Sequence, residues 1–260
     1  MSRVRSIPVL GLAVPSVGAA APVTWQIAEE TAVALEYNGR SHAVMMATPA
    51  DLEDFAVGFS LSEEIIPSAA DLERIALRDT PLGLVVSMTV DPLRLLRGAL
   101  RRRSMEGRSG CGLCGVDSLA NAVREPKRVS ARLSVEPSAI AAAFRALPDH
   151  QPMNRINHSV HAAAWCDPAG DIQVAREDVG RHNALDKLIG ALARSGRDPA
   201  SGFVVMTSRC SFELVQKAAA VSISLLATIS APTALALDLA RGAGVTLGAL
   251  SRDDGVVLFR

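Results

Sequence analysis

Two cysteines separated by two residues are the clearest candidates for chemistry in this sequence. Cys111 and Cys114 lie in the stretch GRSGCGLCG, with glycines at 110, 112 and 115. Glycines let the backbone move and turn its N–H groups toward an anion. Residues 94–108 add six arginines and one glutamate. Because positive charge lowers the pKa of a thiol, the sequence predicts a mobile loop, residues 104–117, that carries a reactive thiolate.

Three kinds of chemistry use a C-x-x-C pair. A zinc site needs two further ligands, for which His158 and His161 are the nearest candidates, although no second C-x-x-C exists. A thioredoxin-like dithiol opens a helix after a strand, whereas here an arginine-rich helical segment precedes the pair. A persulfide carrier needs an exposed thiolate that reaches two partners in turn, and the glycines favour this third chemistry. The pattern alone leaves zinc open.

The two other cysteines have weaker patterns. Cys166 lies among apolar residues of a predicted strand, which is typical of a buried thiol without a chemical role. Cys210 follows Ser208 and Arg209 at a predicted strand-to-helix junction. A single cysteine at such a junction is exposed in some proteins, but it predicts no chemistry by itself.

A second group of polar residues lies where predicted strands meet predicted helices. In REDVGRHN (residues 176–183), Asp178 is a candidate helix cap, Arg181 a phosphate contact and His182 a proton shuttle. Ser208, Arg209 and the segment 230–233 follow the next two strands. Open α/β sheets bind ligands at the carboxyl ends of their strands. These loops therefore predict an anion site, although a capping segment with an ordinary surface histidine gives the same pattern.

The elements that position these residues divide the chain in two. Residues 1–22 are expected to be a flexible tail, and residues 23–120 an α+β domain with strands on both sides of the turn at 37–40. A helix capped by Thr48 is expected up to Ile66, then a strand at 85–90 and a helix from Asp91. In the larger domain, residues 128–260, the predicted strands are 129–133, 160–166, 172–176, 203–207, 223–229, 245–250 and 256–259, and the predicted helices 137–147, 181–194, 212–220 and 232–241.

Strands that alternate with helices of about ten residues predict a mostly parallel sheet with helices on both faces. The boundary between the two domains is expected between Ser118 and Val129. The fold class is therefore α/β, with a three-layer C-terminal domain and a smaller α+β N-terminal domain.

Composition excludes several classes of protein. The 260 residues include 27 basic and 27 acidic side chains, 49% hydrophobic residues and 3% aromatic residues. Such a chain is neither disordered nor a general nucleic-acid binder. Residues 218–237 carry no charge, but their hydroxyl groups and Pro232 favour a buried strand over a membrane span. Residues 1–21 imitate a signal peptide, yet Pro8 and Pro15 break its apolar run. We expect no membrane segment.

Several motifs in order resemble the FdhD/NarQ family, the sulfurtransferases required for formate dehydrogenase activity. These are GRSGCGLCG, REDVGRHNALDK, SFELVQKAA and SAPTALALDLARGAGVTL, together with SHAVMMATPADLEDFAVGFSLSEEII in the N-terminal half. The resemblance covers residues 23–259. It implies a protein that takes sulfur from a cysteine desulfurase as a persulfide and passes it to the molybdenum or tungsten bis-pterin guanine dinucleotide cofactor before the cofactor enters formate dehydrogenase.

The resemblance also assigns residues. Cys111 would carry the persulfide and Cys114 would assist the exchange. The cofactor contacts Arg181, His182, Ser208 and Arg209 are our own hypothesis, prompted by the shared strand-to-helix position of their loops. The family's cofactor segment near the C-terminus, F-x-R-G-G-R, corresponds to Leu250, Ser251, Arg252, Asp253, Asp254 and Gly255. Only its first arginine is kept, as Arg252, so we expect weaker or altered guanine contacts at this segment.

The family fold is a small N-terminal domain joined to a domain that resembles cytidine deaminases, in a cytoplasmic homodimer. The deaminase zinc signature, H-x-E before P-C-x-x-C, is missing here, which disfavours deamination. No permanently bound metal is expected. The competing hypothesis is a zinc-binding assembly chaperone that escorts a molybdoenzyme without moving sulfur.

Overall fold

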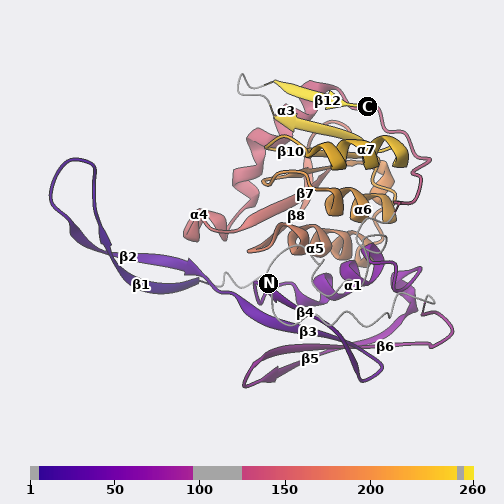
Figure 1. Cartoon of the computed structure of the whole chain (residues 1–260), viewed down its shortest axis with the longest axis horizontal. Helices are drawn as coiled ribbons and strands as arrows, with labels where there is room; N and C mark the ends of the chain where they lie inside the picture. Colours follow the sequence, from indigo (N-terminus) through magenta and orange to yellow (C-terminus); the bar gives the residue numbers. More distant parts are fainter. Residues whose placement is uncertain (1–5, 96–124, 251–254) are drawn as a thin grey trace.

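The chain forms a smaller body, a larger body and a projecting arm (Figure 1). The computed structural model describes residues 6–95, 125–250 and 255–260. The predicted cysteine loop at 104–117, most of the predicted domain boundary and most of the helix expected from Asp91 fall outside these residues, so they stay predictions. Among the described helices, none is long and apolar enough to cross a membrane.

The smaller body is a four-stranded sheet with one helix on its inner face. Its strands are β3 (Thr31–Tyr37), β4 (Arg40–Ala47), β5 (Leu72–Thr80) and β6 (Gly83–Val90), in the order β4-β3-β6-β5. Alternate residues of β3 pack on the phenylalanines of α1 (Leu52–Ser62), as a half-buried strand requires. The sequence predicted the turn at 37–40 but not β5, which is exposed at most positions and lacks a clear apolar alternation.

Thr48 does not cap α1, contrary to the sequence prediction. The helix begins after Asp51, whose backbone is left-handed with φ 53°, and no side chain caps it. The Thr48 hydroxyl instead accepts a hydrogen bond from the N–H of Val179 in the larger body at 3.1 Å. The residue that imitates a cap in the sequence therefore joins the two bodies.

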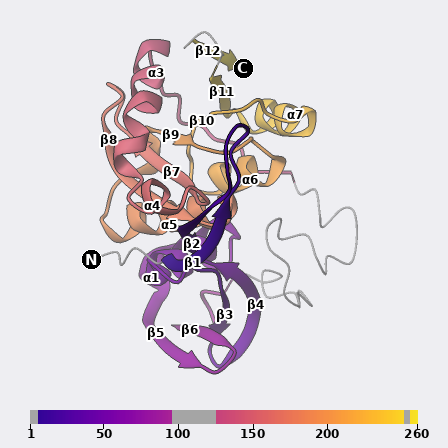
Figure 2. The ribbon, with the colours of Figure 1, turned by 90° about the vertical axis from the view of Figure 1, so that its left-hand side faces the viewer.

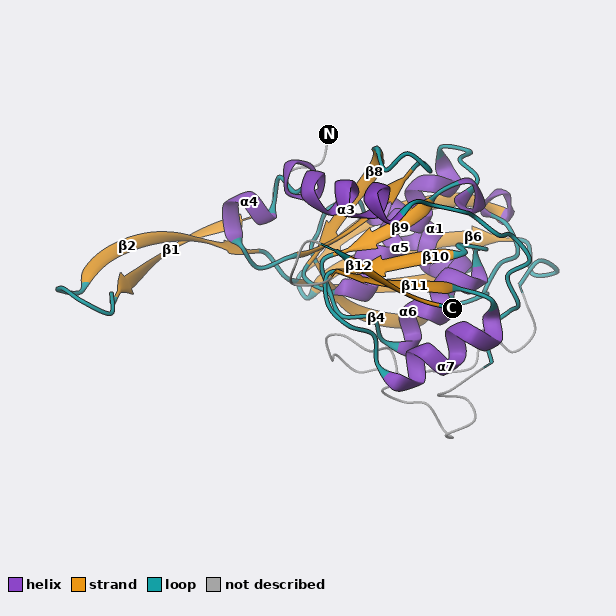
Figure 3. Cartoon of the chain, turned by 90° about the horizontal axis from the view of Figure 1, so that it is seen from above, coloured by secondary structure: helices purple, strands orange, loops and turns teal. Residues whose placement is uncertain are grey.

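The larger body has three layers around a six-stranded sheet, as predicted (Figure 3). Its strands are β7 (His161–Cys166), β8 (Ile172–Asp178), β9 (Phe203–Met206), β10 (Leu225–Thr228), β11 (Thr246–Leu250) and β12 (Val256–Phe259). One face is covered by α3 (Pro137–Ala146) and the other by α5 (Arg181–Arg194), α6 (Phe212–Ala220) and α7 (Ala234–Ala243). The larger body also has three short helices, η2 (Leu147–His150), α4 (Asn154–Asn157) and η3 (Pro199–Ser201). The smaller body has one, η1 (Ala69–Asp71).

The prediction of a mostly parallel sheet is wrong. In the order β12-β11-β10-β9-β7-β8, only the pairs β9–β10 and β10–β11 are parallel. Only residues 167–171 separate β7 from β8 and only residues 251–255 separate β11 from β12, and connections that short make hairpins, which are antiparallel. Helix α6 connects β9 to β10 and helix α7 connects β10 to β11, and these crossovers make the three central strands parallel.

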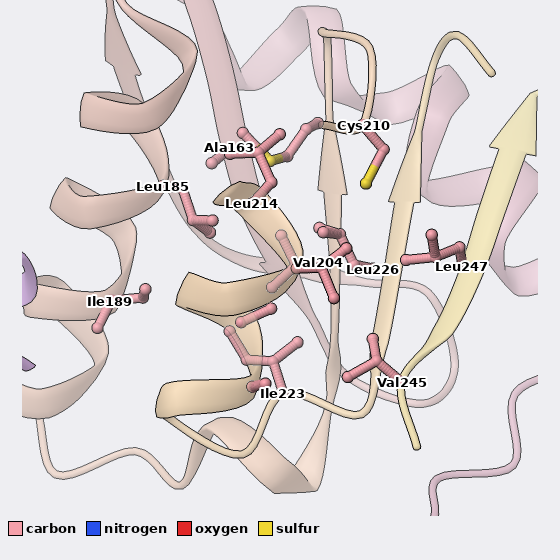
Figure 4. Close-up of a cluster of buried hydrophobic side chains, with 14 of the residues drawn as sticks. Ala163, Leu185, Ile189, Val204, Cys210, Leu214, Ile223, Leu226, Val245 and Leu247 are labelled. Carbon is pink, nitrogen blue, oxygen red and sulfur yellow. The ribbon is translucent and has the colours of Figure 1, made fainter. Parts of the chain in front are cut away.

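Alternation along the central strands builds two cores. Val204 and Met206 face the layer of α5, α6 and α7, while Phe203 and Val205 face α3. Figure 4 shows the first core, where Leu185, Leu214 and Leu226 converge from two helices and a strand. The predicted strand at 129–133 is absent, because Val129 packs in this core with its N–H on the Ala243 carbonyl instead of pairing with a strand.

The N-terminal residues form a β-hairpin where we expected a flexible tail. Strand β1 (Ser6–Ala13) pairs antiparallel with β2 (Ala21–Ala28) from Ser6↔Ala28 to Ala13↔Ala21. Of the two prolines that argued against a helical signal segment, Pro8 lies within β1, whereas Pro15 lies in the connection, residues 14–20, where Gly18 has φ +113°. Breakers of a helix therefore serve as turn residues of a hairpin.

The two bodies are joined by a close helix crossing. A Cβ atom on Gly58 of α1 would lie 1.7 Å from the Asp186 carbonyl oxygen of α5, and one on Gly190 would lie 1.8 Å from that of Asp54. Only glycine lets two helix backbones approach this closely. The crossing fixes α5, and with it the loop before α5, relative to the smaller body.

Candidate functional site

Two of the four cysteines lie in the described part of the chain, and both are unsuited to thiolate chemistry. Cys166 and Cys210 are buried, at 0% and 1% exposure. Burial raises the pKa of each thiol to about 12. Because the thiolate is the reactive form, neither cysteine offers a nucleophile near neutral pH. Cys111 and Cys114 lie outside the described residues.

Loops from several strands meet at one edge of the large sheet, as the sequence predicted. Strands β9, β10 and β11 are parallel and end at this edge. Two of the loops are tied directly, because Thr233 donates its N–H to the Cys210 carbonyl at 3.1 Å and Ile229 donates to that of Met206 at 2.9 Å. Leu250 ends β11 at the same edge, and exposed Gly255 precedes β12. The predicted contacts Ser251, Arg252, Asp253 and Asp254 lie outside the described residues.

Two of the predicted site residues keep buried nitrogens without a hydrogen-bond partner at this edge. Arg181 Nε and His182 Nδ1 are both in this state. His182 is 3% exposed, and its Nε2 lies 3.4 Å from Ser211 Oγ and 3.9 Å from the Glu213 carboxylate. Buried polar groups normally have partners, and these two nitrogens are among the exceptions in the described part of the chain. We call His161, Arg181, His182, Thr207, Ser211 and Glu213 the sheet-edge cluster.

His161 belongs to this cluster although the sequence suggested it only as a zinc ligand. Strand β7 begins at this edge because it runs antiparallel to β9, and its first residue, His161, pairs with Asp178. Burial lowers the pKa of His161, and the charges of Arg181 and His182 lower it further. The Thr207 hydroxyl lies 3.5 Å from its Nδ1. Only the strand directions, which the sequence does not give, bring His161 here.

The predicted contacts Ser208 and Arg209 have different surroundings. Ser208 is buried, and its hydroxyl donates to the Arg209 carbonyl at 3.0 Å. Arg209 is exposed. Arg209 therefore has a side chain free to reach a ligand in solution, whereas Ser208 shapes the loop.

Asp178 does not cap α5, contrary to the sequence prediction. Gly180 precedes the helix, and no side chain caps it. The Asp178 carboxylate is fully buried, accepts the N–H of Thr48 at 3.0 Å and pairs with Lys187 Nζ at 2.6 Å. Asn183 Nδ2 donates both to Asp178 and to the Met46 carbonyl. The segment 176–183 thus has two roles. Asp178 and Asn183 join the two bodies, while Arg181 and His182 lie at the sheet edge.

The zinc hypothesis finds no ligand set among the described residues. Within residues 6–95, 125–250 and 255–260, no group of three or more His, Cys, Asp and Glu side chains is placed to hold a metal ion. The histidines of H-S-V-H separate, because the His158 ring lies beside Trp25 with centroids 6.1 Å apart, while His161 joins the sheet-edge cluster.

Comparison with known proteins places the chain among a well-defined group. A family model described as the FdhD/NarQ family matches residues 28–260. A protein named sulfur carrier protein FdhD from Xanthomonas euvesicatoria pv. vesicatoria (strain 85-10) is 50% identical over 242 residues, 93% of this chain and 86% of the relative. One of the same name from Chromobacterium violaceum is 50% identical over 245 residues, 93% of this chain and 91% of the relative.

A solved structure has the same fold. It is described as a proposed formate dehydrogenase accessory protein from Desulfotalea psychrophila, and it matches with a TM-score of 0.77 and 25% identity over 98% of this chain and 97% of the other. The family match covers nearly the whole chain, including the sheet-edge cluster and the cysteine pair. The chain therefore belongs to the FdhD/NarQ family.

Proposed function

We propose that this protein is a sulfurtransferase that carries sulfur for the maturation of formate dehydrogenase, with Cys111 as the carrier. One observation supports the choice of cysteine most directly: Cys166 and Cys210 are buried with their pKa values raised to about 12. Sulfur transfer requires a thiolate, and this leaves the glycine-flanked pair, Cys111 and Cys114, to provide it. Membership of a family whose relatives are named sulfur carrier proteins supports the same role.

The loading step is an exchange of sulfur between thiols. The Cys111 thiolate attacks the terminal sulfur of a cysteine desulfurase persulfide, so one S–S bond breaks, another forms, and the desulfurase leaves as a thiolate. In the release step Cys114 attacks the inner sulfur of the Cys111 persulfide. A Cys111–Cys114 disulfide forms and the outer sulfur departs as sulfide, its two electrons coming from the cysteine pair. A cellular dithiol then restores both thiols.

The substrate that receives the sulfur is the molybdenum or tungsten bis-pterin guanine dinucleotide cofactor, on its way to the catalytic subunit of formate dehydrogenase. The sheet-edge cluster suits the phosphate and guanine parts of this substrate. Arg181 Nε is a buried donor and His182 Nδ1 a buried donor or acceptor, and neither has a protein partner, while exposed Arg209 lies on the next loop. Arginine forks suit phosphate oxygens. Thiol chemistry of this kind belongs in a reducing compartment, so we place the protein in the cytoplasm.

Transfer of radiolabelled sulfur tests the carrier. We expect the protein, incubated with a cysteine desulfurase and labelled cysteine, to gain label that a reductant removes, and Cys111→Ala to gain none. Cys114→Ala is expected to load normally and to release little sulfide. Cys166→Ser and Cys210→Ser are matched controls with buried thiols and should label like the wild type. Full labelling of Cys111→Ala, or one tightly bound zinc ion with unreactive thiols, would refute the proposal.

Guanosine diphosphate binding tests the sheet-edge cluster. Loss of one arginine–phosphate contact should weaken binding by roughly 10-fold or more in Arg181→Ala and Arg209→Ala. Arg241→Ala is the control, because Arg241 lies on α7 and pairs with exposed Asp238. Unchanged affinity in both test variants, measured by calorimetry, would remove the cluster from the substrate site and leave the carrier role of Cys111 intact.

A further inference from the structure

The first residues of α5 and α6 meet at the sheet-edge cluster. The two helices lie side by side on one face of the large sheet (Figures 1 and 2), and both supply side chains to the same core. His182 is the second residue of α5, Glu213 is the second residue of α6, and Ser211 directly precedes α6. This packing brings polar side chains from two helices within reach of one another.

Glu213 faces one nitrogen of the His182 ring. Its Oε2 lies 3.9 Å from His182 Nε2, and Ser211 Oγ lies 3.4 Å from the same nitrogen. Burial alone would raise the pKa of Glu213, but the neighbouring His182 and Ser211 side chains outweigh burial, so this pKa is lowered. Glu213 is therefore ionised at neutral pH, and an ionised carboxylate only accepts hydrogen bonds.

The carboxylate determines which nitrogen of His182 carries the proton. A neutral imidazole has one N–H donor and one acceptor nitrogen, and the group beside one nitrogen fixes the role of the other. A lone pair on Nε2 would face the negative oxygen of Glu213, and Coulomb repulsion opposes that arrangement. Nε2 is therefore the N–H and Nδ1 the acceptor. Nδ1 is the buried nitrogen that has no partner within the described residues.

An acceptor at Nδ1 limits what a ligand places against it. Ionised phosphate oxygens only accept hydrogen bonds, so they suit Arg181 Nε, which only donates. The group against His182 Nδ1 must instead carry an N–H or an O–H, as the base and the sugar of a nucleotide do. The two neighbouring residues are therefore expected to recognise different parts of one nucleotide.

We infer that Glu213 is a positioning residue, which holds His182 Nε2 as the N–H so that Nδ1 accepts a hydrogen bond from the nucleoside part of the bound substrate. This inference rests on the proposed function, because that proposal assigns the sheet-edge cluster to the substrate. It adds Glu213, a residue absent from the site predicted by the sequence, and it gives His182 a role different from that of Arg181.

Nitrogen NMR of the histidine side chains tests the position of the proton. At about pH 8, above the ordinary histidine pKa of about 6.5, we expect the nitrogen shifts of His182 to show the proton on Nε2. The spectrum of His182→Gln identifies these signals among the five histidines. Glu213→Ala should give a mixture of both neutral forms, whereas Glu213→Gln, whose amide oxygen still accepts the N–H, should keep the wild-type form. A wild-type proton on Nδ1, or on both nitrogens, would overturn the inference.

Binding of guanosine diphosphate (GDP) and of inorganic pyrophosphate tests the role of Nδ1. His182→Gln offers an amide N–H in place of Nε2 and no atom in place of Nδ1. We expect it to weaken GDP binding roughly 10-fold, the effect of one hydrogen bond, and to leave pyrophosphate binding unchanged. Arg181→Ala should weaken both. With dideoxyguanosine diphosphate, which lacks the ribose hydroxyls, a persisting His182→Gln effect assigns the contact to the base, and a lost effect assigns it to the sugar.

Glu213→Ala should weaken GDP binding as much as His182→Gln, and the double variant should be no weaker, since both changes remove one contact. Glu136→Ala is the matched control, because Glu136 is exposed before α3 on the opposite face of the sheet. It should bind GDP like the wild type.

A folded Glu213→Ala that binds GDP as tightly as the wild type would overturn the inference, as would a His182→Gln variant that loses pyrophosphate and GDP affinity equally. Unchanged GDP affinity in both Arg181→Ala and Arg209→Ala would instead refute the assignment of the cluster to the substrate. The NMR result separates the two failures, because it reports the effect of Glu213 on His182 without any ligand.

Discussion

Lys187 is a fully buried cation held between the two bodies. Its Nζ lies 2.6 Å from Asp178 and donates to the Thr48 carbonyl at 2.9 Å. The Asp178 carboxylate also accepts hydrogen bonds from backbone N–H groups on both sides of the interface, at Thr48 and Gly180. Removing one partner of such a buried ion pair leaves the other charge buried without compensation.

Replacing Lys187 by Met is therefore expected to destabilise the protein by about 3–5 kcal/mol, because it leaves a buried negative charge uncompensated. Urea unfolding measures the loss. Arg241→Ala removes an exposed ion pair on α7 and should change the free energy of unfolding by less than about 0.5 kcal/mol. Equal stability of Lys187→Met and the wild type would mean that the Lys187–Asp178 pair does not stabilise the fold.

His161 gives the molecule a pH dependence that can be traced to one residue. Its pKa is lowered in the fold by burial and by Arg181 and His182, so the unfolded chain binds the proton more tightly. The stability from neutral His161 is fully present above the unfolded pKa of about 6.5 and is lost as the pH falls through the lowered value.

We therefore expect the wild type to lose more stability than His161→Gln when the pH falls from about 7.5 to about 5.5. Urea unfolding at both pH values measures the difference. Exposed His150, replaced by Gln, should keep the wild-type dependence. Parallel pH curves for His161→Gln and the wild type would contradict the lowered pKa.

At the scale of residues, the sequence predicted types of chemistry better than it predicted partners. Arg181 and His182 were assigned to a ligand site, and the structure places both at the sheet edge with buried free nitrogens. Asp178 and Thr48 were assigned as helix caps, yet both bond across the interface. A cap is a local pattern, whereas these two bonds join residues 130 and 131 positions apart. Local spacing carries no information about them.

Helix α1 and helix α5 meet through glycine, and this crossing determines the geometry of both bodies. A methyl group on Gly58 or Gly190 would overlap a backbone carbonyl of the other helix rather than a movable side chain. We expect Gly58→Ala and Gly190→Ala to destabilise the protein by at least about 3 kcal/mol, the upper range for overpacking. A lower free energy of unfolding in urea, or a loss of soluble protein, would show this destabilisation.

Gly242 of α7 is the control for this substitution. It is also helical, but among the described residues no atom beyond its chain neighbours and its own helix backbone lies within 4 Å of the place where its Cβ would be. Gly242→Ala should therefore stabilise the protein by up to about 1 kcal/mol through helix propensity. If all three alanine variants behaved alike, propensity rather than the helix crossing would control their stability.

At the scale of elements, periodic segments were predicted well and irregular ones were not. The predicted helices 181–194 and 212–220 match α5 and α6. Both have a clear apolar face toward one core. The strand β5 was missed because it is exposed at most positions, and the N-terminal hairpin was missed because its prolines and glycines imitate a disordered tail. Pairing partners, which the sequence does not reveal, turn such segments into strands.

We expect the whole molecule to unfold as one unit, because charged contacts join the two bodies. Besides the glycine crossing, Asp54 of α1 binds Arg176 and Arg194 of the larger body. Lys217 of α6 lies 2.9 Å from Asp186 and 3.0 Å from Glu63 of the smaller body. Removing the smaller body would expose these buried charges and the small-residue face of α5 together.

The chain has separate probes for the two bodies. Its only tyrosine, Tyr37, is buried in the sheet of the smaller body, and in Trp25→Phe the remaining tryptophan is Trp165 of the larger body. We expect tyrosine absorbance and tryptophan fluorescence of this variant to give the same urea midpoint, because neither body keeps its buried charges paired alone. Two separate midpoints would mean that the bodies unfold independently. The loop before α5 would then be positioned by the larger body alone, and Thr48 and Asp54 would have no influence on the sheet-edge cluster.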